Sequence, residues 1–304
     1  MKESIHKYFK LGLIHFMAYP ACIKGEGPIL ETLEKIAVDD YFDAVEITWI
    51  KDAETRIKAK KLLETSYITV CYGAQPRLLT TGLNPNHLDE NERKKAEATL
   101  IEAIDEAYEM GAKGMAFLAG KWEKNSKETA YEQLIKTTKA LCDYASTKGM
   151  TINLEVFDFD LDKAALIGPA PLAARFAAEM REYTNNFGLM IDLSHIPQTY
   201  ESSRFVVRTL KPFINHIHLG SAVIGDKSYE AYGDTHPRFG FPNGVNDVKE
   251  VLDFLRVLKE EGFLDAENPY VMSFEVKPWG SENPDLVVAN AKRVLNRAWA
   301  ILED

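Results

Sequence analysis

The sequence predicts an α/β fold in which eight parallel strands and eight helices form a single (β/α)8 barrel over residues 1–304. Two observations lead to this prediction. Short apolar runs alternate with longer segments of 3.6-residue periodicity from one end of the chain to the other. The number of apolar runs is eight, which favours closure of a parallel sheet into a barrel. No tract rich in Pro, Gly or Ser marks a boundary between two domains.

The apolar runs have the length of strands. They are 11–17, 44–48, 68–73, 114–119, 151–157, 188–193, 214–219 and 270–276. The first run follows Lys2, Lys7 and Lys10 and so imitates a secretory signal peptide, but it is short and His15 interrupts it. A first barrel strand explains this segment better.

Amphipathic segments lie between these runs, as an alternating fold requires. They are ILETLEKIAV, AETRIKAKKLLE, HLDENERKKAEATLIEAIDEAYEMGAK, TAYEQLIKTTKALCDYASTKG, PLAARFAAEMREY, SSRFVVRTLKPF, DVKEVLDFLRVLKEEG and DLVVANAKRVLNRAWAIL. Gly149 is expected to end the helix that precedes the fifth strand. An open doubly wound sheet is the alternative. It would typically place a glycine-rich phosphate loop after an early strand, and neither GxGxxG nor GxxxxGK[ST] occurs.

Composition limits the classes of partner. The chain has 36 Lys and Arg against 46 Asp and Glu, a net charge of −10, which would repel a nucleic-acid backbone. The cysteines, Cys22, Cys71 and Cys142, are too few and too widely spaced for a disulfide framework and fit a reducing cytoplasm. No run approaches the roughly 18 apolar residues of a membrane span. We therefore expect a cytoplasmic protein with no nucleic-acid and no membrane partner.

Four ionisable side chains lie where four predicted strands end: Glu155 in TINLEVF, Asp192 in GLMIDLSH, His218 in NHIHLGS and Glu275 in YVMSFEV. Ionisable groups are seldom buried without a partner, because their desolvation costs several kcal/mol. Three carboxylates would also repel one another unless a cation lay between them. The pattern predicts one divalent metal ion held by these four side chains. Oxygen-rich ligation suits Mn²⁺, Mg²⁺ or Co²⁺ better than a structural zinc, although Zn²⁺ stays open.

Further polar residues are expected at the same rim. His195 follows Asp192 by three residues, and Asp234 and His236 lie in the irregular segment 220–245, which is too long for a tight turn. Either pair could supply hydrogen bonds to the ligands, a second metal or contacts to substrate hydroxyls.

The order of these motifs resembles that of the xylose isomerase-like barrel superfamily over roughly residues 11–302. The motifs are Glu at strand five, Asp-x-x-His at strand six, HxH at strand seven, a D-x-H loop and Glu at strand eight. This superfamily includes sugar isomerases, ketose 3-epimerases, inosose dehydratases and endonuclease IV-type DNA repair enzymes. The resemblance implies a TIM barrel in which Glu155, Asp192, His218 and Glu275 bind one divalent metal and His195 contacts the substrate.

Departures from the family pattern help to distinguish among the enzyme classes of this superfamily. The endonuclease branch adds histidines after strands three and four, where this chain has VCYGAQP and AFLAGKW. Together with the negative charge, this argues against DNA repair. Epimerases usually follow the last Glu with Pro and an aromatic, whereas this chain has Glu275-Val-Lys-Pro-Trp, in which Lys277 would point inward if the strand continues. Such a lysine could bind a carboxylate, a phosphate or an enolate oxygen, or it could pair with a nearby carboxylate.

Some strand residues have two interpretations. Glu46 in AVEITW could bind substrate or could be a salt-bridged barrel residue. His216 is expected to be a buried barrel histidine rather than a ligand. His15, Trp122 and Trp279 could form apolar walls for a sugar ring, with core packing the default for Trp122.

The sequence thus favours a metal-dependent isomerase or epimerase that acts on a small sugar, a ketose or a keto-cyclitol, through a metal-stabilised enediolate. Glu155 and Glu275 are the candidates for base and acid. The preference for isomerase or epimerase comes from family frequency. An inosose dehydratase-like lyase, with His195 or His236 as the acid, is the alternative. A zinc phosphodiesterase like endonuclease IV and a non-catalytic sugar-binding barrel are further rivals. The sequence does not identify the substrate or the oligomeric state, and a homo-oligomer is one of the possibilities.

Overall fold

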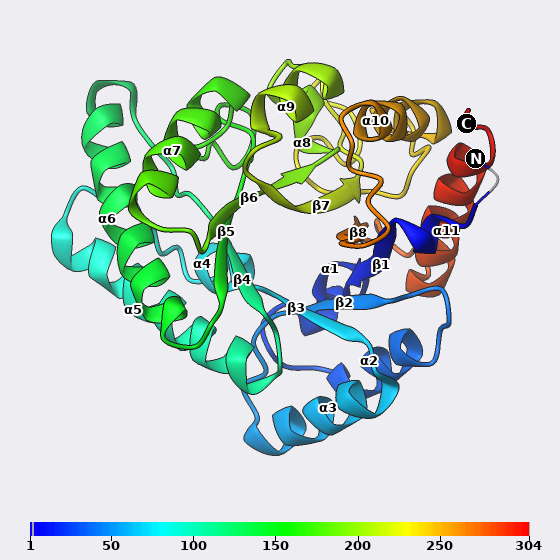
Figure 1. Cartoon of the computed structure of the whole chain (residues 1–304), viewed down its shortest axis with the longest axis horizontal. Coiled ribbons are helices and arrows are strands. Elements are labelled where there is room, and N and C mark those ends of the chain that lie inside the picture. The colour runs from blue at the N-terminus through cyan, green and yellow to red at the C-terminus, as the bar shows by residue number, and fades with distance from the viewer. Residues whose placement is uncertain (2, 304) are drawn as a thin grey trace.

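The computed structural model describes residues 1 and 3–303. Within them, eight parallel strands close into one barrel in the order β1 to β8, which confirms the predicted fold. Helices surround this ring of strands, and the two ends of the chain lie near each other (Figure 1). The strands are β1 (Phe9–Ile14), β2 (Ala44–Ile47), β3 (Thr69–Gly73), β4 (Gly114–Leu118), β5 (Thr151–Glu155), β6 (Phe187–Asp192), β7 (Ile214–Gly220) and β8 (Tyr270–Glu275).

The predicted amphipathic segments form the outer layer of helices. These are α2 (Ile29–Ala37), α3 (Ala53–Ser66), α5 (Glu90–Glu109), α6 (Lys127–Ser146), α7 (Ala170–Tyr183), α9 (Ser203–Leu210), α10 (Val248–Glu260) and α11 (Pro284–Ala300). Their apolar faces pack against the outside of the strands, whose residues are nearly all buried. No helix of the described residues is both long and apolar enough to cross a membrane.

Three short helices follow strands directly and were not predicted: α1 (His15–Ala18), α4 (Gln75–Leu79) and α8 (His195–Gln198). Each has only four or five residues, too few for a periodic pattern to be seen. The first one corrects the boundary of strand 11–17, which ends at Ile14 because the chain then turns into α1. The Tyr19 backbone N–H closes this turn on the His15 carbonyl at 2.8 Å.

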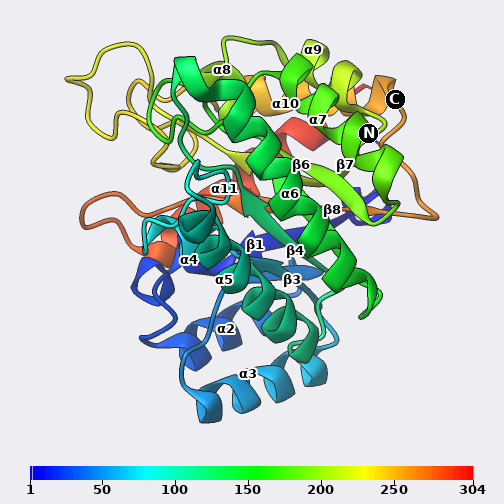
Figure 2. The same cartoon turned by 90° about the vertical axis from the view of Figure 1, so that its left-hand side faces the viewer.

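The loops that follow the strands gather at one end of the barrel. The long segment 221–247 between β7 and α10 and the segment 276–283 after β8 project from this end (Figure 2). A capping box ends the longer loop, because the Asp247 side chain accepts from the first turn of α10 and Glu250 reaches back to the Asp247 N–H. Barrel enzymes build their active sites at this carboxyl end of the strands.

His15 is buried in the protein rather than exposed to a ligand. Its side chain is 3% exposed, and its Nε2 lies 2.7 Å from Thr32 Oγ1. Burial lowers the pKa of His15 to about 3. His15 packs against Thr32 and does not line the cavity at the carboxyl end of the strands, in contrast to the expected wall for a sugar ring.

This burial predicts an acid sensitivity that one substitution should remove. An unfolded imidazole titrates at about 6.5, so between pH 6.5 and pH 3 the unfolded chain binds a proton at His15 that the folded chain does not. The free energy of unfolding should then fall by about 1.4 kcal/mol per pH unit over this range from His15 alone. His15→Gln can still hydrogen-bond Thr32 but does not titrate. When the free energy of unfolding is measured with urea at several pH values, its slope against pH should be smaller in this variant by that amount. Equal slopes in the two proteins would contradict a buried neutral imidazole.

Candidate active site

The four side chains predicted as metal ligands lie together at the carboxyl end of the barrel. Glu155, Asp192 and Glu275 are the last residues of β5, β6 and β8, and His218 lies near the end of β7. One ligand atom from each lies within 4.8 Å of the corresponding atoms of the other three. All four are buried, and the most exposed of them, Glu275, reaches only 7%.

The donor atoms of this group suit a divalent cation. Among the described residues, the buried oxygens Glu155 Oε1 and Asp192 Oδ2 have no hydrogen-bond partner. Leaving such atoms unpaired is costly. His218 Nδ1 faces the same point, 2.9 Å from Glu275 Oε2 and 3.3 Å from Glu155 Oε1. Three carboxylates and one imidazole form a set that Mn²⁺, Mg²⁺ or Co²⁺ accepts.

Neighbouring groups hold the other oxygen of two of these carboxylates. Gln75 Nε2 donates to Glu155 Oε2 at 2.7 Å, and the Ser194 backbone N–H donates to Asp192 Oδ1 at 2.7 Å. Each carboxylate is thus oriented through one oxygen while its second oxygen is left for the centre. Gln75, the first residue of α4, was not among the predicted site residues, and its only signal was its place just after the third strand.

The electrostatics show that negative charge is crowded here. Burial raises the pKa of Glu275 to about 7, and the Glu155 carboxylate adds to this shift although His236 opposes it. Burial would also raise the pKa of Asp192, but His195 and His236 hold it below its usual range. A bound cation would relieve the repulsion among the carboxylates.

A second group of ionisable side chains lies beside the four predicted ligands. His236 Nε2 lies 3.1 Å from Asp234 Oδ1 and 3.4 Å from Glu275 Oε1, so the loop 221–247 reaches the site. Ligand atoms of Asp192, His195 and His236 also lie within 4.8 Å of one another, which makes this a candidate for a second cation. His236 has a positive φ of 51°, and the Lys277 N–H holds its carbonyl at 2.7 Å. Such strained backbone is common where a side chain must be aimed at a site.

His195, at the start of α8, lies beside Asp234 at the rim of the barrel. It was expected to contact substrate, but it is not among the residues that line the central cavity. Its Nδ1–H donates to the Val156 carbonyl at 2.8 Å, and its Nε2 lies 3.2 Å from Asp234 Oδ1. The ring packs on Phe157 with 4.2 Å between centroids. The α8 turn thus places His195 beside Asp234, and its contact with substrate stays a prediction.

A cavity of about 250 Å³ opens above the predicted ligands. It is lined by the predicted residues Glu46, Glu155, His218, Asp234, His236, Glu275 and Lys277. Its lining also includes apolar residues, which are Ile14, Phe16, Met17, Ile23, Pro76 and Leu79. The predicted walls Trp122 and Trp279 do not line it, because their indole N–H groups bond the Phe159 carbonyl and Glu230 elsewhere.

Two lysines enter this cavity. The Lys277 side chain lines it and forms no hydrogen bond or ion pair with any described residue, which favours substrate contact over ion pairing. Lys163 was not predicted. Its Nζ lies 3.3 Å from Asp234 Oδ2 and 2.8 Å from Asp162 Oδ2. The buried Asp158 carboxylate orders this loop by accepting four backbone N–H groups, those of residues 161 to 164.

Comparisons with known proteins agree with this architecture. The model of the family described as xylose isomerase-like TIM barrel matches residues 35–295. The chain belongs to this family. The resemblance inferred from the motif order is thereby confirmed. No curated protein sequence matches the chain.

Solved structures of this fold cover nearly the whole chain. A D-tagatose 3-epimerase-like protein is 20% identical with a TM-score of 0.73, and the match covers 97% of this chain and 98% of that one. The D-psicose 3-epimerase of Clostridium cellulolyticum H10 is 18% identical with a TM-score of 0.73, covering 97% and 100%. An L-ribulose 3-epimerase is 16% identical with a TM-score of 0.70, covering 96% of each chain. At such identities the likeness establishes the fold alone.

Proposed function

We propose that this family member is a divalent-metal-dependent sugar isomerase or epimerase that acts on a ketose or a keto-cyclitol. One observation carries the proposal. Two glutamates, Glu155 and Glu275, lie at the ends of β5 and β8 and line one cavity, and a histidine, His218, stands between them. The similar structures include ketose 3-epimerases, which favours the same class of chemistry here.

The residues that would hold the cation are Glu155, Asp192, His218 and Glu275. When bound, a divalent cation would stabilise the negative charge that develops on a substrate carbonyl oxygen. Lowering the cost of this charge makes the neighbouring C–H group more acidic. A carboxylate of the protein can then remove its proton.

In this mechanism one glutamate removes a proton from the substrate and the other returns one. Glu155 is oriented by Gln75 through Oε2 and lines the cavity, so its carboxylate is the candidate to take a proton from the substrate carbon while it also holds the cation. Glu275 comes from β8, three strands further round the barrel than β5, which carries Glu155, and approaches from another side. A proton returned to the opposite face of the same carbon gives the epimer, whereas one returned to the neighbouring carbon gives the isomer.

The shape of the cavity fits a small polyhydroxylated ligand. Its volume of about 250 Å³ lies below the range of about 300–1,000 Å³ of pockets for drug-sized molecules. The apolar part of the lining, with Phe16 and Leu79, can pack against the C–H groups of a sugar, while Lys277 and His236 can bind its oxygens. A lyase reaction is the second candidate, because His236 Nε2, 3.4 Å from Glu275 Oε1, is placed to protonate a departing hydroxyl.

Solvent exchange tests the proposed reaction. The Mn²⁺-loaded protein, incubated in D₂O with a panel of ketoses and keto-cyclitols, should place deuterium on the carbon beside the carbonyl of its substrate. NMR should show this label together with the epimer or isomer. A dehydrated product would favour the lyase reaction, and a lack of both exchange and conversion across the panel would contradict the proposal.

A further inference from the structure

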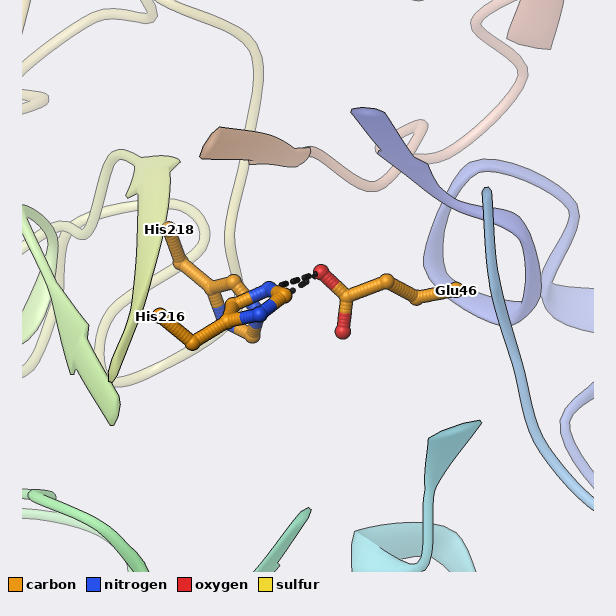
Figure 3. A group of neighbouring side chains, drawn as sticks. All are labelled: Glu46, His216 and His218. Atoms are coloured by element: carbon orange, nitrogen blue, oxygen red, sulfur yellow. Dashed lines mark hydrogen bonds and ion pairs between the residues drawn. The ribbon is translucent and has the colours of Figure 1, made fainter. Parts of the chain in front are cut away.

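A buried trio of side chains lies at the base of the candidate site. Glu46 projects from β2, and His216 and His218 project from β7 on the other side of the barrel, so that all three meet inside it (Figure 3). A single oxygen, Glu46 Oε1, lies 2.6 Å from His216 Nε2 and 3.0 Å from His218 Nε2. Glu46 and His218 are each 1% exposed and His216 is 5% exposed.

The contacts of Glu46 fix which nitrogen of His218 carries a proton. A carboxylate only accepts, so His218 must present an N–H at Nε2. A neutral imidazole has one N–H, and its lone pair is then on Nδ1. Nδ1 is the atom that faces Glu275 Oε2 at 2.9 Å and Glu155 Oε1 at 3.3 Å, on the side of the proposed metal.

From this geometry we infer that Glu46 is a positioning residue, which holds His218 in the Nε2–H form and thereby offers Nδ1 to the metal. The inference rests on the proposed function, since it assumes a cation between Glu155, Asp192, His218 and Glu275. Hydrogen bonds from metal-binding histidines to carboxylates orient the ring and make it a stronger ligand. Glu46 thus acts on the metal through His218.

His216 completes the arrangement by holding Glu46 itself. The hydrogen bond from His216 to Glu46 Oε1 restrains the Glu46 carboxylate, which would otherwise have His218 as its one partner across the barrel. Glu46 lines the cavity of the site and also a cavity of about 430 Å³ at the other end of the barrel, which His216 lines as well. Glu46 and His216 therefore lie between the two cavities. This explains why two histidines, spaced to share one direction along β7, stand in the barrel interior.

Titration of metal-free protein with Mn²⁺ tests the inference without any substrate. Glu46→Ala should bind one Mn²⁺ per chain with an affinity about 10- to 100-fold weaker than the wild type, as is typical when such a partner is lost. Glu46→Gln keeps an acceptor oxygen for both histidines and should lose clearly less. His216→Gln should weaken binding in the same direction because it releases Glu46. Circular dichroism verifies that each variant is folded.

Several outcomes would overturn the inference. Equal Mn²⁺ affinity in the wild type and in both Glu46 variants would do so, as would an effect only on KM at saturating Mn²⁺, which would make Glu46 a substrate ligand. A fall from two Mn²⁺ ions to one in Glu46→Ala would show that the trio binds its own cation. If Glu46→Ala does not fold, ¹⁵N spectra of the Zn²⁺-loaded wild type decide: the inference requires His218 as the Nε2–H tautomer, and an Nδ1–H tautomer contradicts it. Wild type that binds no metal would instead refute the proposed function, a distinct result.

Discussion

Glu155→Gln should lower kcat by about 10²–10⁴-fold, the usual contribution of a positioned proton carrier. Glu155 is 1% exposed, and its Oε2 is fixed by Gln75 at 2.7 Å. A glutamine there has nearly the same shape, so the fold and the lining of the cavity should persist. A glutamine side chain cannot take a proton from the substrate carbon, however, and it is a weaker metal ligand. Loss of proton transfer should therefore remain even when Mn²⁺ is raised to saturation.

Two further variants separate the loss of proton transfer from the weaker binding of metal. Glu155→Asp keeps a carboxylate, although a shorter one, and should retain more activity and more deuterium exchange than Glu155→Gln at saturating Mn²⁺. Gln75→Ala removes only the donor to Oε2 and should have a smaller effect than either. Wild-type exchange rates in saturated Glu155→Gln would rule this residue out as the proton carrier.

Glu275→Gln should change stability in opposite directions with and without metal. Burial and neighbouring charge raise the pKa of Glu275 to about 7 in the metal-free protein, whereas an unfolded glutamate titrates at about 4.3. The folded state thus keeps its proton more tightly, and ionisation becomes a cost to folding as the pH rises through this interval. By pH 8 that cost is about 4 kcal/mol, from about 1.4 kcal/mol per pKa unit.

Without metal, Glu275→Gln should therefore be the more stable protein at pH 8 and equal to the wild type near pH 4. With Mn²⁺ at 1,000 times its Kd, the wild type should gain about 4 kcal/mol and the variant much less. Urea unfolding with and without chelator measures both differences. Glu106→Gln is a suitable control, because Glu106 pairs with Arg77 at 2.8 Å outside the site, and any change in the stability of this variant should be the same in both conditions. A loss of that uniform kind in Glu275→Gln would contradict a repulsive, metal-binding cluster.

The fold was predictable because its signals are local and repeated. Eight apolar runs and the helices between them follow from periodicity, and the carboxyl ends of parallel strands in a barrel must meet. For this reason the four strand ends that carry Glu155, Asp192, His218 and Glu275 could be assigned to one site from the sequence alone. The structure places their ligand atoms within 4.8 Å of one another.

What the sequence did not reveal depends on short turns and long-range partners. Gln75 reaches Glu155 because the five-residue helix α4 turns it inward, and the four-residue helix α8 sets the contact of His195 with the Val156 carbonyl. Helices of this length have no periodic signal. The pairing of Glu46 with His216 joins residues 170 positions apart on strands that are not neighbours. Alternation along a strand shows that both point inward, but not that they meet.

The most direct test of the central claim is the metal content of protein purified without a metal-affinity tag, measured beside Glu275→Gln. The wild type is expected to contain about one Mn, Mg or Co per chain, and the variant is expected to lose it. Two or three zinc ions per chain would instead indicate that the group of Asp192, His195 and His236 is also filled, as expected for a phosphodiesterase. No metal in the wild type, even after incubation with Mn²⁺, would contradict the account.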